Sequence, residues 1–194
     1  MSLDELLSGN EKFRNTLFKE HRELYTELMK GQKPTVLWIG CSDSRVQTGH
    51  ITGTNPGTIF NHRNIGNIIP PGDWNISTVL EYGIKHLKIR DIVICGHSDC
   101  GAVKALDADL EDSYVPNWLS NAMEAKNRVD KKLESSGGVK DPRERSRMIE
   151  HENVRLQVEH LRTYPIIKKG LENKTLDVHG LYYDIESGVL SKVI

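Results

Sequence analysis

The chain has 194 residues, of which 37% are hydrophobic and 27% are charged, and its formal net charge is −1. This balance is typical of one globular domain, and the charge does not indicate a nucleic-acid-binding surface. No apolar stretch approaches the ~18 residues of a membrane-spanning helix, and the acidic N-terminal stretch does not resemble a signal peptide. We therefore expect a cytoplasmic protein that binds neither nucleic acid nor membrane. Three cysteines are too few for a disulfide scaffold, so reduced thiols are expected.

The apolar pattern predicts helices alternating with strands. Leucines at helical spacing among charged residues predict an N-terminal helix, and continuous apolar runs predict buried strands. In chain order, the predicted elements are a helix over 3–30, strands over 35–41 and 58–60, a helix over 73–87, a strand over 91–97, a helix just after residue 100, helices over 116–133 and 142–164, and strands over 176–183 and 188–194. This order predicts an α/β fold with a central, mostly parallel sheet flanked by helices. We expect one domain, with a helical arm over 1–33 and a core over 34–194.

Two of the predicted strands end in residues that can bind a metal. Cys41 closes one strand, and His97 and Cys100 follow the end of another. Because ligands bind beyond the carboxyl ends of parallel strands, the three residues can approach the same point. Two cysteines and one histidine suit zinc, and three protein ligands leave the fourth tetrahedral position open, as in catalytic zinc sites.

Simpler interpretations of these residues remain. Taken alone, Cys41 is more typical of an inert buried cysteine, and His97 of a structural histidine, than of a metal ligand. A redox pair of Cys100 with Cys95 competes with the zinc site, although Cys95 lies within a predicted strand and is better interpreted as a core residue.

Asp43 and Arg45 lie two positions apart, which places both side chains on one face of an extended segment. An aspartate paired with an arginine stays ionised at neutral pH. Beside an open metal site, the carboxylate can accept a hydrogen bond from the attacking oxygen, or it can move onto the metal as a conditional fourth ligand. The alternative is a surface salt bridge contributing ~0–1 kcal/mol.

Three segments carry a family resemblance. They are Cys41-Ser-Asp-Ser-Arg45, Phe60-Asn-His-Arg-Asn-Ile-Gly-Asn67 and Gly96-His-Ser-Asp-Cys-Gly101. In order and spacing they resemble the signature segments of the β-class carbonic anhydrases. The segments 6–13 and 179–184 also resemble the family, so the resemblance covers nearly the whole chain.

The resemblance implies an enzyme that hydrates carbon dioxide reversibly to bicarbonate and a proton. One Zn²⁺ per subunit would be bound by Cys41, His97 and Cys100, with Asp43 and Arg45 as the catalytic dyad. A homodimer, often paired into a homotetramer, is implied as well, with the N-terminal helix embracing the partner subunit.

The resemblance also assigns a substrate pocket. Phe60, Ile65 and Tyr82 fall where the family lines this pocket, and an apolar wall suits uncharged carbon dioxide. Gly101 falls where a backbone N–H can face the substrate oxygen.

A second set of residues resembles the non-catalytic bicarbonate pocket of the regulated, bicarbonate-inhibited subtype. This set consists of Trp38, Arg63 and Tyr183. Asn55 stands where plant-like members carry glutamine, which favours the regulated subtype. Bicarbonate bound there could draw Arg45 away from Asp43 and release that carboxylate to the metal. In the competing interpretation, Trp38 is a core aromatic residue, Tyr183 an ordinary strand residue and Arg63 an interface ion-pair partner.

Three other functions compete with carbon dioxide hydration. The same zinc site can act on carbonyl sulfide or carbon disulfide. A zinc-holding bicarbonate sensor would keep Asp43 permanently on the metal. A redox protein would use Cys95 and Cys100.

Overall fold

The computed structural model of the chain, which describes residues 1–139 and 141–194, divides into two units, Met1–Lys33 and Pro34–Ile194. The first unit holds three helices, α1 (Leu3–Asn15), α2 (Leu17–Glu20) and α3 (Arg22–Leu28). The predicted continuous helix over 3–30 is therefore wrong. The helical path breaks at Thr16 and His21, and the Thr16 hydroxyl donates a hydrogen bond of 2.8 Å to the Lys12 carbonyl. Threonine favours such local hydrogen bonds over helix continuation.

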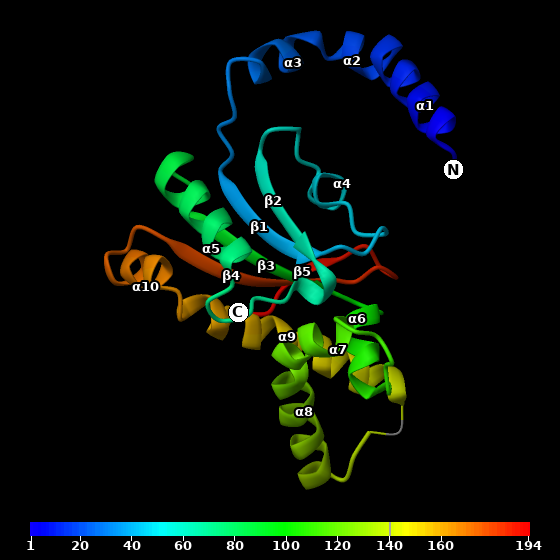
Figure 1. Ribbon diagram of the computed structural model, residues 1–194, viewed down its shortest axis with the longest axis vertical. Helices are drawn as coiled ribbons and strands as arrows, with labels where there is room; N and C mark the ends of the chain where they lie inside the picture. Colours follow the sequence, from blue (N-terminus) through cyan, green and yellow to red (C-terminus); the bar gives the residue numbers. More distant parts are fainter. Residues whose placement is uncertain (140) are drawn as a thin grey trace. The chain divides into compact units, whose positions relative to one another are not determined.

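The second unit is built on a sheet whose described strands run in the order β2-β1-β3-β4-β5. Its strands are β1 (Val36–Cys41), β2 (Ile59–Asn64), β3 (Asp91–His97), β4 (Asp177–Tyr183) and β5 (Leu190–Lys192). The first four are mutually parallel, and β5 pairs antiparallel with β4 (Figure 1). The predicted α/β fold with a mostly parallel sheet is confirmed, although β2 continues to Asn64 and does not end at residue 60.

Helices connect these strands. They are α4 (Thr48–Thr52), α5 (Trp74–Glu81), α6 (Gly101–Lys104), α7 (Val115–Leu119), α8 (Met123–Ser136), α9 (Pro142–Arg162) and α10 (Pro165–Glu172). Short turns of other helix types are η1 (Ile65–Asn67), η2 (Tyr82–His86), η3 (Ala105–Asp107) and η4 (Ser120–Ala122).

Several helix predictions need correction. The helix predicted over 73–87 ends as a regular α-helix at Glu81 and continues as the π-helical turn η2. The helix predicted over 116–133 is two helices joined by η4. Two observed helices, α4 and α10, were not predicted. Proline is favoured in the first turn of a helix, and Pro165 begins α10 there.

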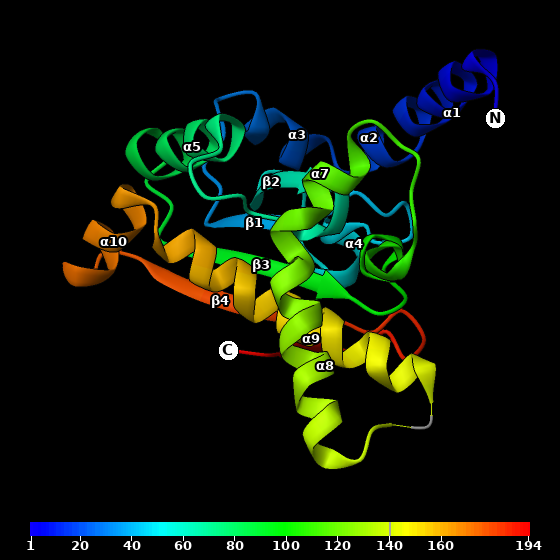
Figure 2. The same ribbon diagram turned by 60° about the horizontal axis from the view of Figure 1, so that its bottom comes forward.

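One face of the sheet packs against α5, α9 and α10 and forms the larger core. Leu37, Ile39, Ile92 and Ile94 contribute from the strands to this buried cluster. In Figure 2, α9 lies along β3 and β4, and α8 crosses it. This arrangement brings α9 beneath the carboxyl end of β3.

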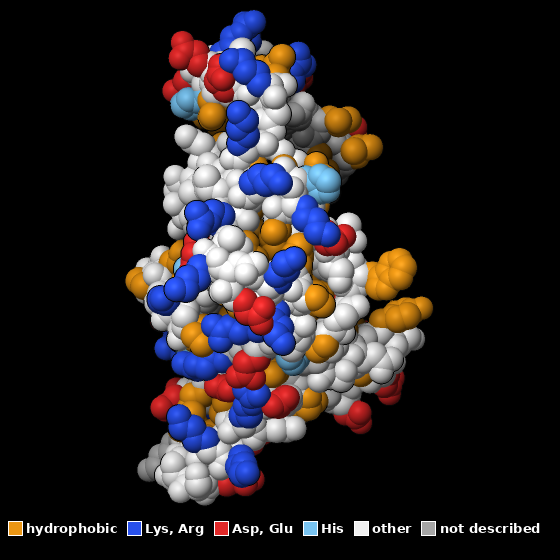
Figure 3. Space-filling model, turned by 90° about the vertical axis from the view of Figure 1, so that its left-hand side faces the viewer, with side chains coloured by type: hydrophobic (Ala, Val, Ile, Leu, Met, Phe, Trp, Pro, Cys, Tyr) orange, Lys and Arg blue, Asp and Glu red, His pale blue; other side chains and the backbone are white. Residues whose placement is uncertain are grey.

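The described surface carries mixed charges. Figure 3 shows one face on which Lys and Arg side chains are interspersed with Asp, Glu and hydrophobic side chains. Among residues 1–139 and 141–194, none of the helices has the length and apolar character needed to cross a membrane.

Candidate metal centre

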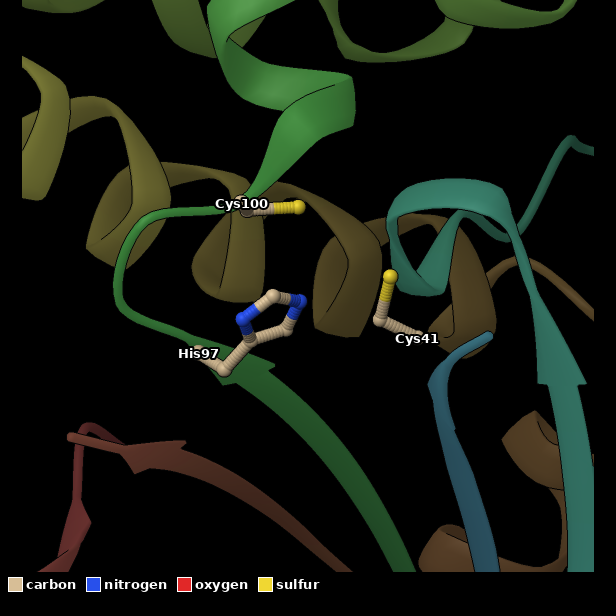
Figure 4. A group of neighbouring side chains, drawn as sticks. All are labelled: Cys41, His97 and Cys100. Carbon is tan, nitrogen blue, oxygen red and sulfur yellow. The ribbon is translucent and has the colours of Figure 1, made fainter. Parts of the chain in front are cut away.

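Three candidate ligands meet where the topology of the sheet reverses. Cys41 ends β1, His97 ends β3, and Cys100 precedes α6 as its N-cap. The chain leaves β1 for β2 on one side and later forms β3 on the other, which makes the carboxyl ends of β1 and β3 the switch point at which α/β sheets typically bind ligands. The three side chains point toward one another (Figure 4), and their ligand atoms all lie within 4.8 Å of one another.

The chemistry of His97 fits a cation in this group. The ring is 1% exposed, and Nδ1 lies 2.9 Å from the carbonyl oxygen of Ser98. Because a carbonyl only accepts hydrogen bonds, Nδ1 carries a proton, which leaves Nε2 as the ring nitrogen that can present a lone pair to a metal ion. Nε2 is buried and has no hydrogen-bond partner in the described part of the chain. Buried polar atoms are normally partnered, so a metal ion would satisfy this one.

The two thiols share an environment that favours one thiolate. The hydrogen bond with Cys100 lowers the pKa of Cys41, against burial, which raises it. The same hydrogen bond, together with burial, raises the pKa of Cys100. The backbone N–H of Gly66 also donates to Cys41 Sγ at 3.4 Å. The pair therefore readily releases a first proton, and a cation would favour release of the second.

Cys95 lies in a different setting. Burial raises the pKa of its thiol to about 12, and its S–H donates to the Gly96 carbonyl oxygen at 3.2 Å. It packs with Trp38 and Val93 in a separate cluster. A neutral, buried thiol of this kind is unreactive.

The predicted pair of Asp43 and Arg45 is formed. Arg45 Nε donates to Asp43 Oδ1 at 3.0 Å, and Arg45 Nη2 donates to Asp43 Oδ2 at 2.7 Å. The Arg45 backbone N–H adds a third hydrogen bond at 2.9 Å. The Arg45 guanidinium holds the pKa of Asp43 well below its usual range. Asp43 Oδ2 lies 4.0 Å from His97 Nε2, so the carboxylate borders the candidate ligands while Arg45 restrains it.

A second carboxylate, that of Asp99, accepts a hydrogen bond from the same arginine. Arg45 Nη1 donates to Asp99 Oδ2 at 2.9 Å, and Nη2 reaches the Asp99 carbonyl at 3.2 Å. Lys104 binds the other carboxylate oxygen of Asp99. Asp99 adopts a left-handed backbone conformation (φ 61°), which aspartate tolerates better than most residues. The loop between His97 and Cys100 therefore also restrains Arg45, a contact that the sequence did not predict.

The residues assigned to a substrate pocket fall into two groups. Ile65 begins η1 and is 51% exposed, and Gly101 begins α6 directly after Cys100. Phe60 and Tyr82 form a separate aromatic pair, with ring centroids 5.9 Å apart. Phe60 lies opposite Leu37 in the sheet, about 13 Å from the ligand end of β1 at ~3.3 Å per residue. One subunit therefore brings Ile65 and Gly101 to the ligand loops, but not Phe60 and Tyr82.

The residues of the regulatory trio share one face of the sheet. Strand alternation and register place Trp38, Arg63 and Tyr183 on the face opposite the larger core. Trp38 and Tyr183 pack in one cluster. Arg63 donates to the carbonyl oxygens of Cys41 (2.8 Å) and Asp43 (2.6 Å). Arg63 therefore fixes the backbone that carries both a ligand and the dyad carboxylate.

An α/β protein with buried nitrogen and sulfur donors at the switch point of its sheet belongs, by fold and site, to the candidate metalloenzymes. Comparison with known sequences narrows this class. The family model described as carbonic anhydrase matches residues 36–190. A carbonic anhydrase of Synechococcus elongatus is 35% identical over 196 residues, covering 97% of this chain and 71% of the relative. A carbonic anhydrase of Helicobacter pylori is 35% identical over 195 residues, covering 95% and 87% respectively.

Solved structures agree with the sequences. One of two tetrameric β-carbonic anhydrases from Sordaria macrospora superposes with a TM-score of 0.90 at 34% identity, covering 97% of this chain and 95% of the other. The chain therefore belongs to the carbonic anhydrase family, in its β class, whose members are carbonate dehydratases.

Proposed function

We propose that this chain is a zinc enzyme that hydrates carbon dioxide reversibly to bicarbonate and a proton. Cys41, His97 and Cys100 would hold one Zn²⁺ per subunit. The observation that carries the proposal is the buried group of three donors with His97 Nε2 unpartnered. A bound zinc ion would lower the pKa of water from ~15.7 towards ~7 and so supply hydroxide near neutral pH.

The chain's own residues would orient the reaction. Asp43 stays ionised beside the ligands and can accept a hydrogen bond from the attacking oxygen at Oδ2. Arg45 holds that carboxylate in place. Released from Arg45, Asp43 is close enough to serve as a conditional fourth ligand, which would close the site. Ile65 offers an apolar wall and Gly101 a backbone N–H to the substrate.

Self-association would complete the pocket. In one subunit, Phe60 and Tyr82 lie away from the ligand loops, and Tyr82 is 45% exposed. The helices of the N-terminal arm bury none of their residues, although they carry exposed leucines such as Leu3 and Leu7. The Sordaria relatives are tetrameric. We therefore propose a homodimer as the smallest active unit, which can pair into a tetramer; light scattering of the purified protein tests this.

Stopped-flow measurement of carbon dioxide hydration tests the enzymatic proposal. Zinc-loaded wild-type protein should be active at alkaline pH, and Cys41→Ala should lose zinc and activity together. Wild-type protein that holds one zinc per subunit but is inactive at every pH would overturn the proposal and favour a bicarbonate sensor. Assays with carbonyl sulfide and carbon disulfide test the alternative substrates on the same preparation.

We further propose bicarbonate inhibition through Trp38, Arg63 and Tyr183. The Arg63 guanidinium already holds the Asp43 backbone, so an anion competing for that guanidinium would loosen the dyad segment. Activity should then fall steeply below about pH 8 and fall further with added bicarbonate. Arg63→Gln should remove the bicarbonate effect. A shallow pH profile that bicarbonate does not change would contradict this regulation.

A further inference from the structure

Helix α9 carries a row of buried polar side chains toward the ligand loops. Glu150, Asn153 and Gln157 are 2%, 2% and 0% exposed. Their spacing places all three on one side of the helix. Val154 and Leu156, which lie among them, are buried apolar residues. Buried polar groups need hydrogen-bond partners, and the partners of this row identify what it does.

Glu150 binds the backbone of one candidate ligand. Its Oε1 accepts the backbone N–H of Cys100 at 3.1 Å and the hydroxyl of Ser146 at 3.3 Å. Its Oε2 accepts the hydroxyl of Tyr182 at 2.6 Å. Both carboxyl oxygens are therefore fixed, and the position of Cys100 is tied to α9.

Asn153 reaches the second cysteine through one intervening residue. Asn153 Nδ2 donates to the carbonyl oxygen of Gly66 at 3.1 Å, and Gln157 Nε2 holds Asn153 Oδ1 at 2.8 Å. The Gly66 N–H in turn donates to Cys41 Sγ. Gly66 has φ 77°, a conformation that favours glycine, and this conformation accompanies both hydrogen bonds.

Glycines in the sheet allow α9 to lie this close. A Cβ at Gly96 would meet Val154 Cγ2 at 2.7 Å, and a Cβ at Gly180 would meet Val154 Cγ1 at 2.8 Å. Because both strands lack a side chain at these points, short polar side chains on α9 can reach the ligand loops. In Figure 4, α9 passes behind the three labelled ligands.

We propose that Glu150 and Asn153 are positioning residues that hold Cys100 and Cys41 at their metal-binding separation before the metal arrives. This inference rests on the proposed function, which makes these cysteines zinc ligands. Two thiolates repel each other, and α9 opposes their separation by fixing both backbones. A preorganised site binds more tightly because the loops need not be ordered on binding. Loss of such outer partners typically weakens metal affinity by about 10–100-fold.

Two measurements test the inference. One is zinc affinity, determined by competition with a chromophoric chelator, and the other is the absorption spectrum of the Co²⁺-substituted protein. Glu150→Asp keeps the carboxyl group but is too short to reach Cys100, whereas Glu150→Gln keeps the length and one acceptor oxygen. We expect Glu150→Asp and Asn153→Ala to bind zinc about 10–100-fold more weakly and to shift the thiolate-to-cobalt bands. Glu150→Gln should stay close to wild type.

Tyr164→Phe is the matched control. It removes hydrogen bonds to the Pro70 carbonyl and from the Asp73 N–H within the same unit, without touching a ligand loop. It should lower thermal stability and leave zinc affinity unchanged. If one of the test variants does not fold, the other decides by the same measurements.

The outcomes separate this inference from the proposed function. Wild-type protein that binds no zinc overturns the proposed function itself. If wild type binds zinc, three results overturn the positioning role. The first is zinc affinity equal to wild type in both Glu150→Asp and Asn153→Ala. The second is a loss of zinc affinity in Tyr164→Phe as large as that in the test variants. The third is a loss of zinc affinity in Glu150→Gln with no loss in Glu150→Asp.

Discussion

Replacing Gly96 by alanine should force α9 away from the sheet next to His97. The added Cβ would lie 2.7 Å from Val154 Cγ2, about 0.7 Å inside the 3.4 Å at which ordinary contact begins. Val154 is fully buried and cannot rotate into open space. Overpacking of this kind destabilises a protein by about 1–3 kcal/mol. For a chain of this size, each kcal/mol lowers the melting temperature by about 2–4 °C.

A double-mutant cycle isolates the contact. Val154→Ala alone should cost about 2 kcal/mol, because it removes two buried methyl groups and leaves a small cavity. In the double variant, the smaller side chain makes room for the new Cβ, so the two losses should fall short of additivity by about 1 kcal/mol or more. Urea unfolding of the zinc-free proteins measures this coupling. Losses that add within about 0.5 kcal/mol would refute the close approach between α9 and β3.

Three further predictions concern other parts of the second unit. Arg145 lowers the pKa of Asp107 and Asp130, so these carboxylates stabilise the fold above their unfolded pKa of ~3.9 and lose that contribution as the pH falls through the lower folded pKa. Arg145→Gln should therefore be less stable than wild type by about 1 kcal/mol in urea unfolding at pH 7, because partial solvent exposure weakens these ion pairs. The difference in stability should shrink below about pH 4, and a difference that does not change with pH would contradict this reasoning. Cys95→Ala should retain one zinc per subunit by metal analysis and full activity in strong reductant, whereas loss of either would revive the redox interpretation. Gly66→Ala should lose about 1–3 kcal/mol of stability in thermal unfolding, because φ 77° is strained for alanine, and should bind zinc more weakly by chelator competition; unchanged values would show that the peptide relaxes freely.

The sequence identified the elements whose signals are local. The apolar runs ending at Cys41 and His97 predicted β1 and β3, and polar residues following a strand predicted the edge at which the candidate ligands lie. The spacing of Asp43 and Arg45 predicted their pairing. These predictions depended on periodicity and on the ends of strands, which a single sequence displays directly.

Features that depend on tertiary partners were missed. The role of Asp99 as a second acceptor for Arg45 requires that two separate loops meet. Glu150 and Asn153 occupy helix positions among apolar neighbours, a pattern that signals buried polar contacts, but the sequence does not reveal which loop they contact. The break at Thr16 depends on competing local hydrogen bonds that helical spacing does not report.

The parallel pairing of β1 with β3 has a consequence for the order of assembly. These neighbours in the sheet are separated along the chain by β2 and α5, so Cys41 joins the other two candidate ligands only after distant segments dock. A partly folded chain would offer a metal only His97 and Cys100 from one loop. In small zinc-dependent domains the ion drives folding, whereas here the complete ligand set exists only where β1 and β3 have paired, so the ion would be bound by the finished scaffold. Metal loading would thus mark the completion of folding in a newly made chain.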